Sequence, residues 1–167
     1  MTERFLIIAE AAELLHREAA AVDEQRWDDW LALYLPEAEF WAPTWLTETQ
    51  LTSDPKKELS HLYYATRAGL EDRVWRIRGG RSPASVPMPR TTHIVDNVLV
   101  ESHSPRERMT VKSHFVAHTF SNRTKGQTVR FGRYIHDFEW RDGWLIRKKT
   151  VIINNDYVET MLDIYNI

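Results

Sequence analysis

Cysteine is missing from the sequence, with 0 among 167 residues. This absence excludes disulfide bonds, thiolate nucleophiles, cysteine-ligated zinc and iron–sulfur clusters held by cysteine. Long apolar runs are lacking too, since none approaches the roughly 20 residues that a membrane span requires. The first residues, MTERFLII, carry charge where a secretory signal would be apolar. We therefore expect a cytoplasmic protein that has no membrane partner.

An excess of one charge sign is also absent, because 22 Lys and Arg face 24 Asp and Glu for a net charge of -2. Such a balance gives no overall field that would gather nucleic acid. Nucleotide, nucleophile-elbow and zinc-protease motifs are missing as well. The pair Gly79-Gly80, followed by Arg81, could hold an anion, but within a proline-rich segment it is more typical of a turn.

Aromatic residues, in contrast, are plentiful: 7 Trp, 6 Tyr and 6 Phe. Large aromatic side chains favour either a protein core or the buried patches between subunits. Composition alone does not separate these two interpretations.

Three helices are predicted from apolar spacing and end signals. The first, residues 3–22, carries one apolar stripe and places charged residues, Glu18 among them, on its other faces. The second covers residues 25–34 and ends before Pro36. The third covers residues 66–78, with Thr66 as its cap. The stripe of the first helix consists of Phe5, Ile8, Ala12, Leu15, Ala19 and Val22.

The remaining segments favour extended structure and turns. Residues 39–45 read as a strand and residues 47–57 as a loop, while the three prolines of residues 79–90 predict a long, stiff connection. Four strands then follow in residues 92–101, 109–122, 128–140 and 144–154. Asp142-Gly143 is a hairpin signal between the last two.

Helices followed by a series of hairpin-connected strands indicate an α+β fold. The strands are longer than usual, which predicts bending. We therefore expect one domain over residues 1–167 with a cystatin-like cone, in which N-terminal helices pack on a long curved antiparallel sheet.

A cone has an interior, so its histidines are candidates for chemistry. His114 and His118 lie four residues apart, but on a strand this spacing separates them by roughly 13 Å, too far for one metal ion. An acid–base pair remains possible, formed by His114 or His136 with Asp96 or Glu139. The same residues could equally form a solvated outer face.

Arginines are concentrated between residues 73 and 90. Their planar forks suit bidentate pairing with carboxylates across a protein interface. The segment is therefore either a docking element or an exposed, solvated stretch.

Several uncommon runs occur in one order along the chain: Gly69-Leu70-Glu71-Asp72-Arg73-Val74, Arg81-Ser82-Pro83-Ala84-Ser85, and Pro89-Arg90-Thr91-Thr92-His93. The flanking runs are Trp27-Asp28-Asp29-Trp30-Leu31, Asn155-Asp156-Tyr157-Val158, and Leu162-Asp163-Ile164-Tyr165. Together they resemble the small, or beta, subunit of aromatic-ring-hydroxylating (Rieske non-haem iron) dioxygenases. The resemblance is strongest to the branch that acts on benzoate, toluate and anthranilate.

This resemblance implies a homotrimer that joins three large (alpha) subunits in a hexamer. The large subunit would carry a Rieske 2Fe–2S cluster and a mononuclear iron, and NADH would supply electrons through a separate reductase. The product would be a cis-diol of an aromatic carboxylate, benzoate first and anthranilate second. This chain would contribute no catalytic, cofactor-binding or metal-binding residue. From their physical character and their position in the matching part of the sequence, we nominate six residues as its subunit contacts: Arg73, Trp75, Arg76, Arg81, Arg90 and Tyr157.

Two other functions remain open from the sequence. One is a free-standing isomerase or dehydratase with an acid–base pair inside the cone, and the other is a small-molecule binding module. The enzyme requires a titratable pair in a substrate-sized cavity. A scaffold requires a cone filled by aromatics and an apolar outer surface.

Overall fold

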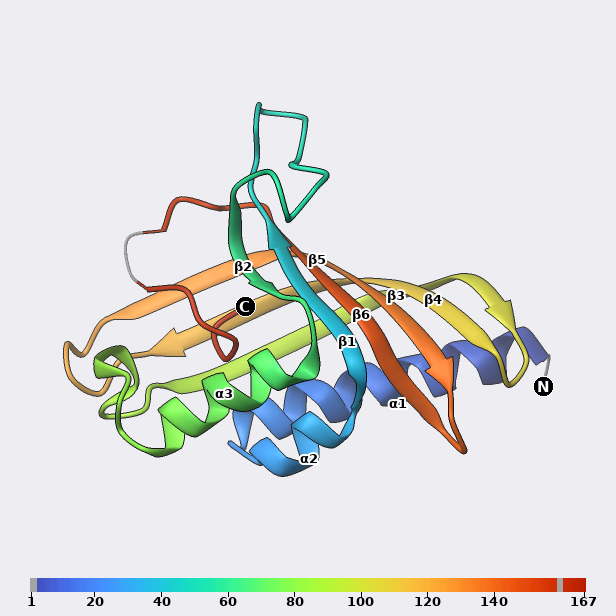
Figure 1. Ribbon diagram of the computed structural model, residues 1–167, viewed down its shortest axis with the longest axis horizontal. Coiled ribbons are helices and arrows are strands. Elements are labelled where there is room, and N and C mark those ends of the chain that lie inside the picture. Colours follow the sequence, from blue (N-terminus) through green and yellow to red (C-terminus); the bar gives the residue numbers. More distant parts are fainter. Residues whose placement is uncertain (1–2, 159–160) are drawn as a thin grey trace.

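The computed structural model describes residues 3–158 and 161–167. It is an α+β structure in which helices cover one side of a curved sheet (Figure 1). The helices are α1 (Glu3–Asp23), α2 (Trp27–Ala32) and α3 (Arg67–Arg78), with a short 3-10 turn at Pro83–Ser85. The strands are β1 (Tyr34–Pro43), β2 (Ser60–Tyr64), β3 (Arg90–Ser104), β4 (Arg108–Phe120), β5 (Gln127–Trp140) and β6 (Trp144–Ile153). The predicted fold class is confirmed.

The strands form a six-stranded sheet in the order β2-β1-β6-β5-β4-β3. Strands β3 to β6 form an antiparallel meander, as predicted, and β2 pairs antiparallel with β1. The pairing of β1 with β6 is parallel, so the sheet is not antiparallel throughout. A parallel pair needs a long connection between its two strands, and here the chain from β2 through α3 to β5 provides it. Helices α1 and α2 precede β1 and lie beneath the sheet (Figure 1).

The apolar interior lies between the sheet and the helices. Strand β4 shows why: its residues alternate between the two faces, and Met109, Val111, Phe115 and Ala117 turn inward and are buried. Tyr134 and Phe138 of β5 belong to the same core. The three longest strands have 15, 13 and 14 residues, and β3 contains register shifts that bend it, as expected for a curved sheet.

Helix α1 differs from the prediction in the direction that its buried stripe faces. The buried residues are Ala11, Leu15, Glu18, Ala21 and Val22, whereas Phe5 remains 56% exposed. Phe5 lies in the first turns of the helix, where the exposed Leu6 adjoins it. Glu18, which was expected on an outer face, is 3% exposed and therefore lies inside the cone.

Two boundaries near α2 were predicted incorrectly. Helix α2 ends at Ala32, and Tyr34 already belongs to β1, so the strand starts well before residue 39. Pro36 lies on an exposed position of that strand, where its missing N–H is tolerated. Strand β2 was not predicted, because its run Ser60–Tyr64 is short and half-buried throughout.

Strand β5 passes very close to β6 at Gly132. A Cβ atom at this position would lie 1.9 Å from the Ile152 carbonyl oxygen. Only glycine allows this approach of the two backbones. Among the described residues, no helix is long and apolar enough to cross a membrane.

Candidate functional site

The cone interior contains a buried polar cluster formed by four residues from four elements. Glu18 of α1 lies at its centre and receives hydrogen bonds from Tyr34 Oη of β1, His136 Nε2 of β5 (2.9 Å) and Lys149 Nζ of β6 (2.8 Å). Each of the four residues is at most 5% exposed. A single carboxylate thus ties α1 to three strands.

The charge of Glu18 is maintained by its neighbours. Burial alone would raise the pKa of this carboxyl, but Lys149 and His136 hold the pKa far below its usual range. Burial lowers the pKa of His136 against the opposing effect of Glu18, so its imidazole is neutral at pH 7. Burial and the nearby Glu18 charge raise the pKa of Tyr34 well above its usual value, which keeps its hydroxyl a donor. The cluster is therefore an ion pair between Glu18 and Lys149, supported by two neutral donors.

The cavity beside this cluster is too small for a substrate. Its volume is about 10 Å³, and Glu18, His93, Tyr134 and Lys149 are among the residues that line it. Ligand pockets usually measure about 300–1,000 Å³, and ~10–15 Å³ holds one water molecule. A titratable cluster is present, but the substrate-sized space that an isomerase or dehydratase requires is not present beside it.

The acid–base pairs expected from the sequence do not form inside the cone. Asp96 and His114 are cross-strand neighbours, but both are exposed on the outer face of the sheet. Glu139 forms ion pairs with Arg108, Arg141 and Arg147. His136 does lie inside, yet its partner is Glu18.

The sequence does indicate that Glu18 and Lys149 are buried, although neither was among the predicted site residues. Glu18 lies between Leu15 and Val22 at helical spacing, so it falls on the apolar stripe. Lys149 is followed by an unbroken run of buried residues at the end of β6. A charged residue on an apolar stripe requires a partner of opposite charge nearby.

His114 and His118 do not form a metal site. Both lie on the outer face of β4, and His118 is 3.4 Å from the Gln127 side-chain nitrogen. In the ranges 3–158 and 161–167, no three His, Cys, Asp or Glu side chains come together in a way that could hold a metal ion.

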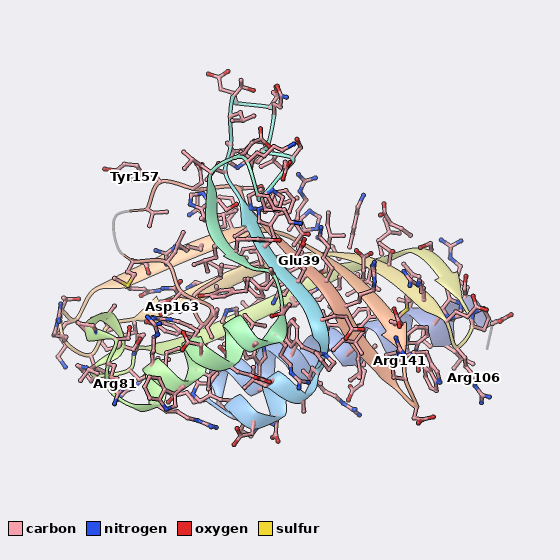
Figure 2. The ribbon with its side chains drawn as sticks, in the orientation of Figure 1. Glu39, Arg81, Arg106, Arg141, Tyr157 and Asp163 are labelled. Atoms are coloured by element: carbon pink, nitrogen blue, oxygen red, sulfur yellow. The ribbon has the colours of Figure 1, made fainter. Side chains whose placement is uncertain are left out.

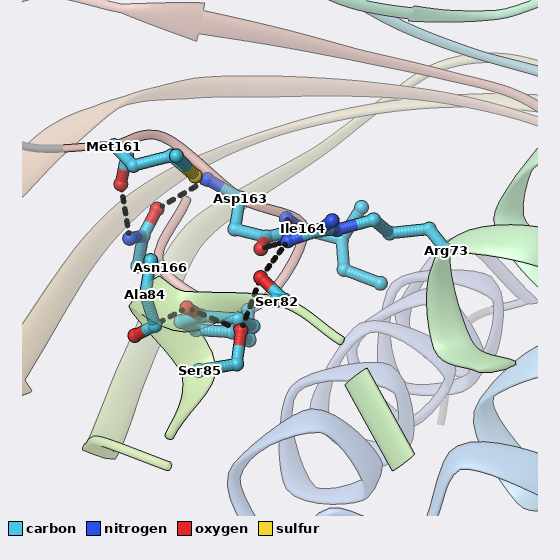
Figure 3. Close-up of polar contacts among 9 residues, drawn as sticks. Arg73, Ser82, Ala84, Ser85, Met161, Asp163, Ile164 and Asn166 are labelled. Carbon is cyan, nitrogen blue, oxygen red and sulfur yellow. Dashed lines mark hydrogen bonds and ion pairs between the residues drawn. The ribbon is translucent and has the colours of Figure 1, made fainter. Parts of the chain in front are cut away.

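The mouth of the cone is filled by the segment 161–167, which lies between the sheet and α3 (Figures 1 and 3). Ile164, Tyr165 and Ile167 are at most 2% exposed. Arg73 of α3 donates from Nε to Asp163 Oδ1 (2.8 Å) and from Nη2 to Ser82 Oγ (2.8 Å), and it also pairs with Asp163 Oδ2. Arg73 therefore fastens this segment within the chain.

The other nominated contact residues lie on the surface. Trp75 is 54% exposed, and the Arg81 guanidinium lies 4.1 Å from the centre of its ring. Arg76 pairs with Asp72 on α3, and Arg90 begins β3 with its side chain exposed. Tyr157 is 83% exposed and points away from the body (Figure 2). Arg81 and Tyr157 are far apart in this view, so the six nominations do not form one patch.

The outer face of the sheet carries apolar side chains where an isolated sheet would be polar. Ile94, Val116 and Phe131 are cross-strand neighbours on β3, β4 and β5, and Ile94 and Phe131 are 54% and 44% exposed. Val129 lies on the same face two residues before Phe131, and the exposed Leu99 lies beyond the polar row Asp96, His114 and Arg133. An exposed apolar patch with a polar rim is typical of an interaction site.

These features define a class of small cone-shaped α+β proteins whose interior is closed. A putative scytalone dehydratase from Novosphingobium aromaticivorans shares the fold alone, with a TM-score of 0.69 at 13% identity, covering 96% of this chain and 93% of that one. The chain belongs to the family described as Ring hydroxylating beta subunit, whose model matches residues 17–160. The family resemblance predicted from the sequence is thereby confirmed.

Two relatives illustrate the similarity. The chain is 41% identical over 162 residues to the benzoate 1,2-dioxygenase subunit beta of Acinetobacter baylyi, covering 96% of this chain and 94% of the relative. The crystal structure of the benzoate 1,2-dioxygenase beta subunit from Burkholderia mallei matches with a TM-score of 0.77 at 34% identity. That match covers 95% of this chain and 96% of the other.

Proposed function

We propose that this chain is the non-catalytic, structural subunit of a complex that cis-dihydroxylates an aromatic carboxylate. Benzoate is the first candidate substrate, as in the names of its relatives, and anthranilate is the second. Both oxygen atoms of O2 would enter the ring, with electrons from NADH delivered by a separate reductase. The chain would act as one domain over residues 1–167, in the cytoplasm.

The observation that carries this proposal is the filled interior of the cone. The space that a substrate would need is taken by core aromatics and by Ile164, Tyr165 and Ile167, and about 10 Å³ remains beside the polar cluster. We assign a structural role to the buried Glu18–Lys149 pair, because the hydrogen bonds that Glu18 accepts join four elements. Function is then expected at the surface.

The iron groups of the proposed complex would be bound by the large subunit. A Rieske cluster needs two cysteine ligands beside two histidines, and this sequence has 0 cysteines. A mononuclear iron site needs converging side chains, whereas His114 and His118 point outward from one strand and His136 is bonded to Glu18. We therefore assign both metal groups to the partner.

The apolar outer face of the sheet supports a homotrimer. A ring of three copies uses two different surfaces on each copy, which meet head to tail. Asp96 and Arg133 flank the row formed by Ile94, Val116 and Phe131, and neither forms an ion pair among the described residues. Opposite charges beside an apolar strip can fix the register of such a contact.

The nominated residues divide into two groups in this proposal. Trp75, Arg76, Arg81, Arg90 and Tyr157 are accessible and remain proposed contacts with the large subunit or a second copy. Arg73 would act indirectly, because its guanidinium already holds Asp163 and Ser82. Its role would be to position α3 against the segment 161–167.

The test is to purify the chain alone and together with its large-subunit partner. We expect the isolated chain to be a metal-free trimer without activity on benzoate. The mixture should form a hexamer that contains iron, and when O2, NADH and the reductase are added it should convert benzoate to its cis-diol. Turnover of an aromatic acid by the isolated chain, or failure to bind the large subunit, would contradict the proposal. Native mass spectrometry, metal analysis and product chromatography provide the readouts.

A further inference from the structure

A groove lies at the end of the sheet where the proline-rich connection meets the turn between β4 and β5. Its volume is about 600 Å³, and its walls include Pro83, Val86, Pro87, Arg123 and Met161. In Figure 1 this end lies opposite the N-terminus of α1. We call it the basic groove, because Arg123 lines it and Lys125 and Arg90 adjoin lining residues in the sequence.

The walls of the basic groove are rigid and partly apolar. Prolines fix the backbone of the connection. Asn122 Nδ2, in the β4–β5 turn, donates a hydrogen bond to the Met88 carbonyl of the connection (3.2 Å). Tyr165 Oη and Ser85 Oγ are hydrogen-bonded at 3.1 Å, which joins the connection to the segment 161–167. Val86 and Met161 remain 49% and 59% exposed. The groove is therefore pre-formed and presents apolar surface to solvent.

Among the described residues that line this groove, Arg123 is charged and none is Asp or Glu. Residues 79–95 and 108–136 contain no Asp or Glu, and both segments meet here. Arg123 lines the groove, Lys125 lies in the same turn, and Arg90 follows the lining residue Pro89. Within the described part of the chain, none of these three side chains forms an ion pair. Two described carboxylates near this end already have partners: Asp163 is buried and held by Arg73, and Asp23 accepts hydrogen bonds from Thr91 and His93.

A second groove at the opposite end of the sheet provides the contrast. It is lined by Glu3, Glu10, Arg106 and Trp144, among others, so it carries charges of both signs. Arg106 lies there in the turn that precedes β4, just as Arg123 lies in the turn that follows it. Both arginines are exposed, and neither has an ion-pair partner among the residues described.

We propose that the basic groove receives an extended segment of the large subunit that carries apolar side chains and carboxylates. This inference rests on the proposed function and names the surface and chemistry of its subunit contact. Val86, Met161 and the prolines would cover the apolar side chains of the segment. Arg123 and Arg90 would pair with its carboxylates through bidentate hydrogen bonds, which favour Asp and Glu.

The experiment compares Arg123→Glu with the matched variant Arg106→Glu, each purified and titrated against the large subunit. Both substitutions change an exposed turn arginine and shift the net charge equally. We expect Arg123→Glu to weaken binding by about tenfold or more, and Arg106→Glu to change it by less than about twofold. Val86→Asp, which places a charge on the apolar wall, should also weaken binding. Circular dichroism would verify that all three variants are folded.

The possible outcomes separate the two proposals. If the unmodified chain does not bind the large subunit, the proposed function is wrong. If it binds and Arg123→Glu binds equally well, or if only Arg106→Glu weakens binding, the basic groove is not the contact. A change in the mass of the isolated chain caused by Arg123→Glu would place a second copy in the groove and would also overturn the inference.

Discussion

Glu18 shows how a charged residue is retained in an apolar interior. A buried carboxylate is tolerated when its partners replace the hydrogen bonds of water. Lys149 supplies the opposite charge, and Tyr34 and His136 supply further donors. Because the cluster joins α1 to β1, β5 and β6, its geometry depends on the correct placement of the helix under the sheet.

Removal of the charge partner should therefore destabilise the protein strongly. In Lys149→Met, Glu18 would stay buried without a cation, and we expect the free energy of unfolding to fall by about 3–5 kcal/mol. The neighbouring Lys148 pairs with Glu39 at 2.7 Å but is 34% exposed. Lys148→Met should cost no more than about 1 kcal/mol. Urea denaturation of both variants measures the difference, and equal losses would contradict this view of the cluster.

At the scale of elements, the close approach of β5 and β6 depends on one glycine. In Gly132→Ala the new Cβ would meet the Ile152 carbonyl oxygen, so the two strands would have to separate. We expect a loss of about 3 kcal/mol or more in stability.

The control for this substitution is Gly143→Ala in the β5–β6 turn. A Cβ atom there would meet nothing within 4 Å, so the stability should change by less than about 1 kcal/mol. Thermal unfolding followed by circular dichroism compares the two variants. A Gly132→Ala protein as stable as Gly143→Ala would show that the strands can move apart at little cost.

The elements that the sequence predicted well are those with strong local patterns. Strands β3 to β6 were located because β-branched and aromatic residues fill them and turn residues separate them, and α3 was located by its spacing. Strand β2 lacks such a pattern, since all its residues are half-buried. The sequence pattern does not predict the end of α2, because the position of Tyr34 in β1 depends on its contact with the distant Glu18. No local pattern reveals that contact.

The candidate site was predictable only in part, for a similar reason. His136 was recognised as a candidate, but its partner Glu18 lies 118 residues away in the sequence. The arginine-rich segment was recognised too, yet the role of Arg73 emerges only when residue 163 is brought against α3. Long-range pairings of this kind depend on topology, and a single sequence does not specify them.

At the scale of the whole molecule, the apolar outer face of the sheet should control self-association. In Phe131→Glu a charge would enter the proposed contact between copies, at a side chain that is 44% exposed in the single chain. We expect each contact to lose about 2 kcal/mol or more, so that the trimer dissociates at micromolar concentration.

A matched substitution is Leu59→Glu, which also replaces an exposed apolar residue by a charge. Leu59 is 80% exposed and lies in the loop before β2, away from this face. The Leu59→Glu substitution should therefore leave the trimer intact. Analytical ultracentrifugation distinguishes the species, and a Phe131→Glu protein that retains the mass of the unmodified chain would exclude the sheet face as the contact.

The parallel pairing of β1 with β6 has a consequence for synthesis on the ribosome. Residues 34–43 leave the ribosome well before their partner strand, residues 144–153. One edge of β1 must therefore stay unpaired in the nascent chain until the codons for β6 have been read. A premature stop between the codons for β5 and β6 would leave a polypeptide that contains the other five strands yet cannot join β1 to the meander.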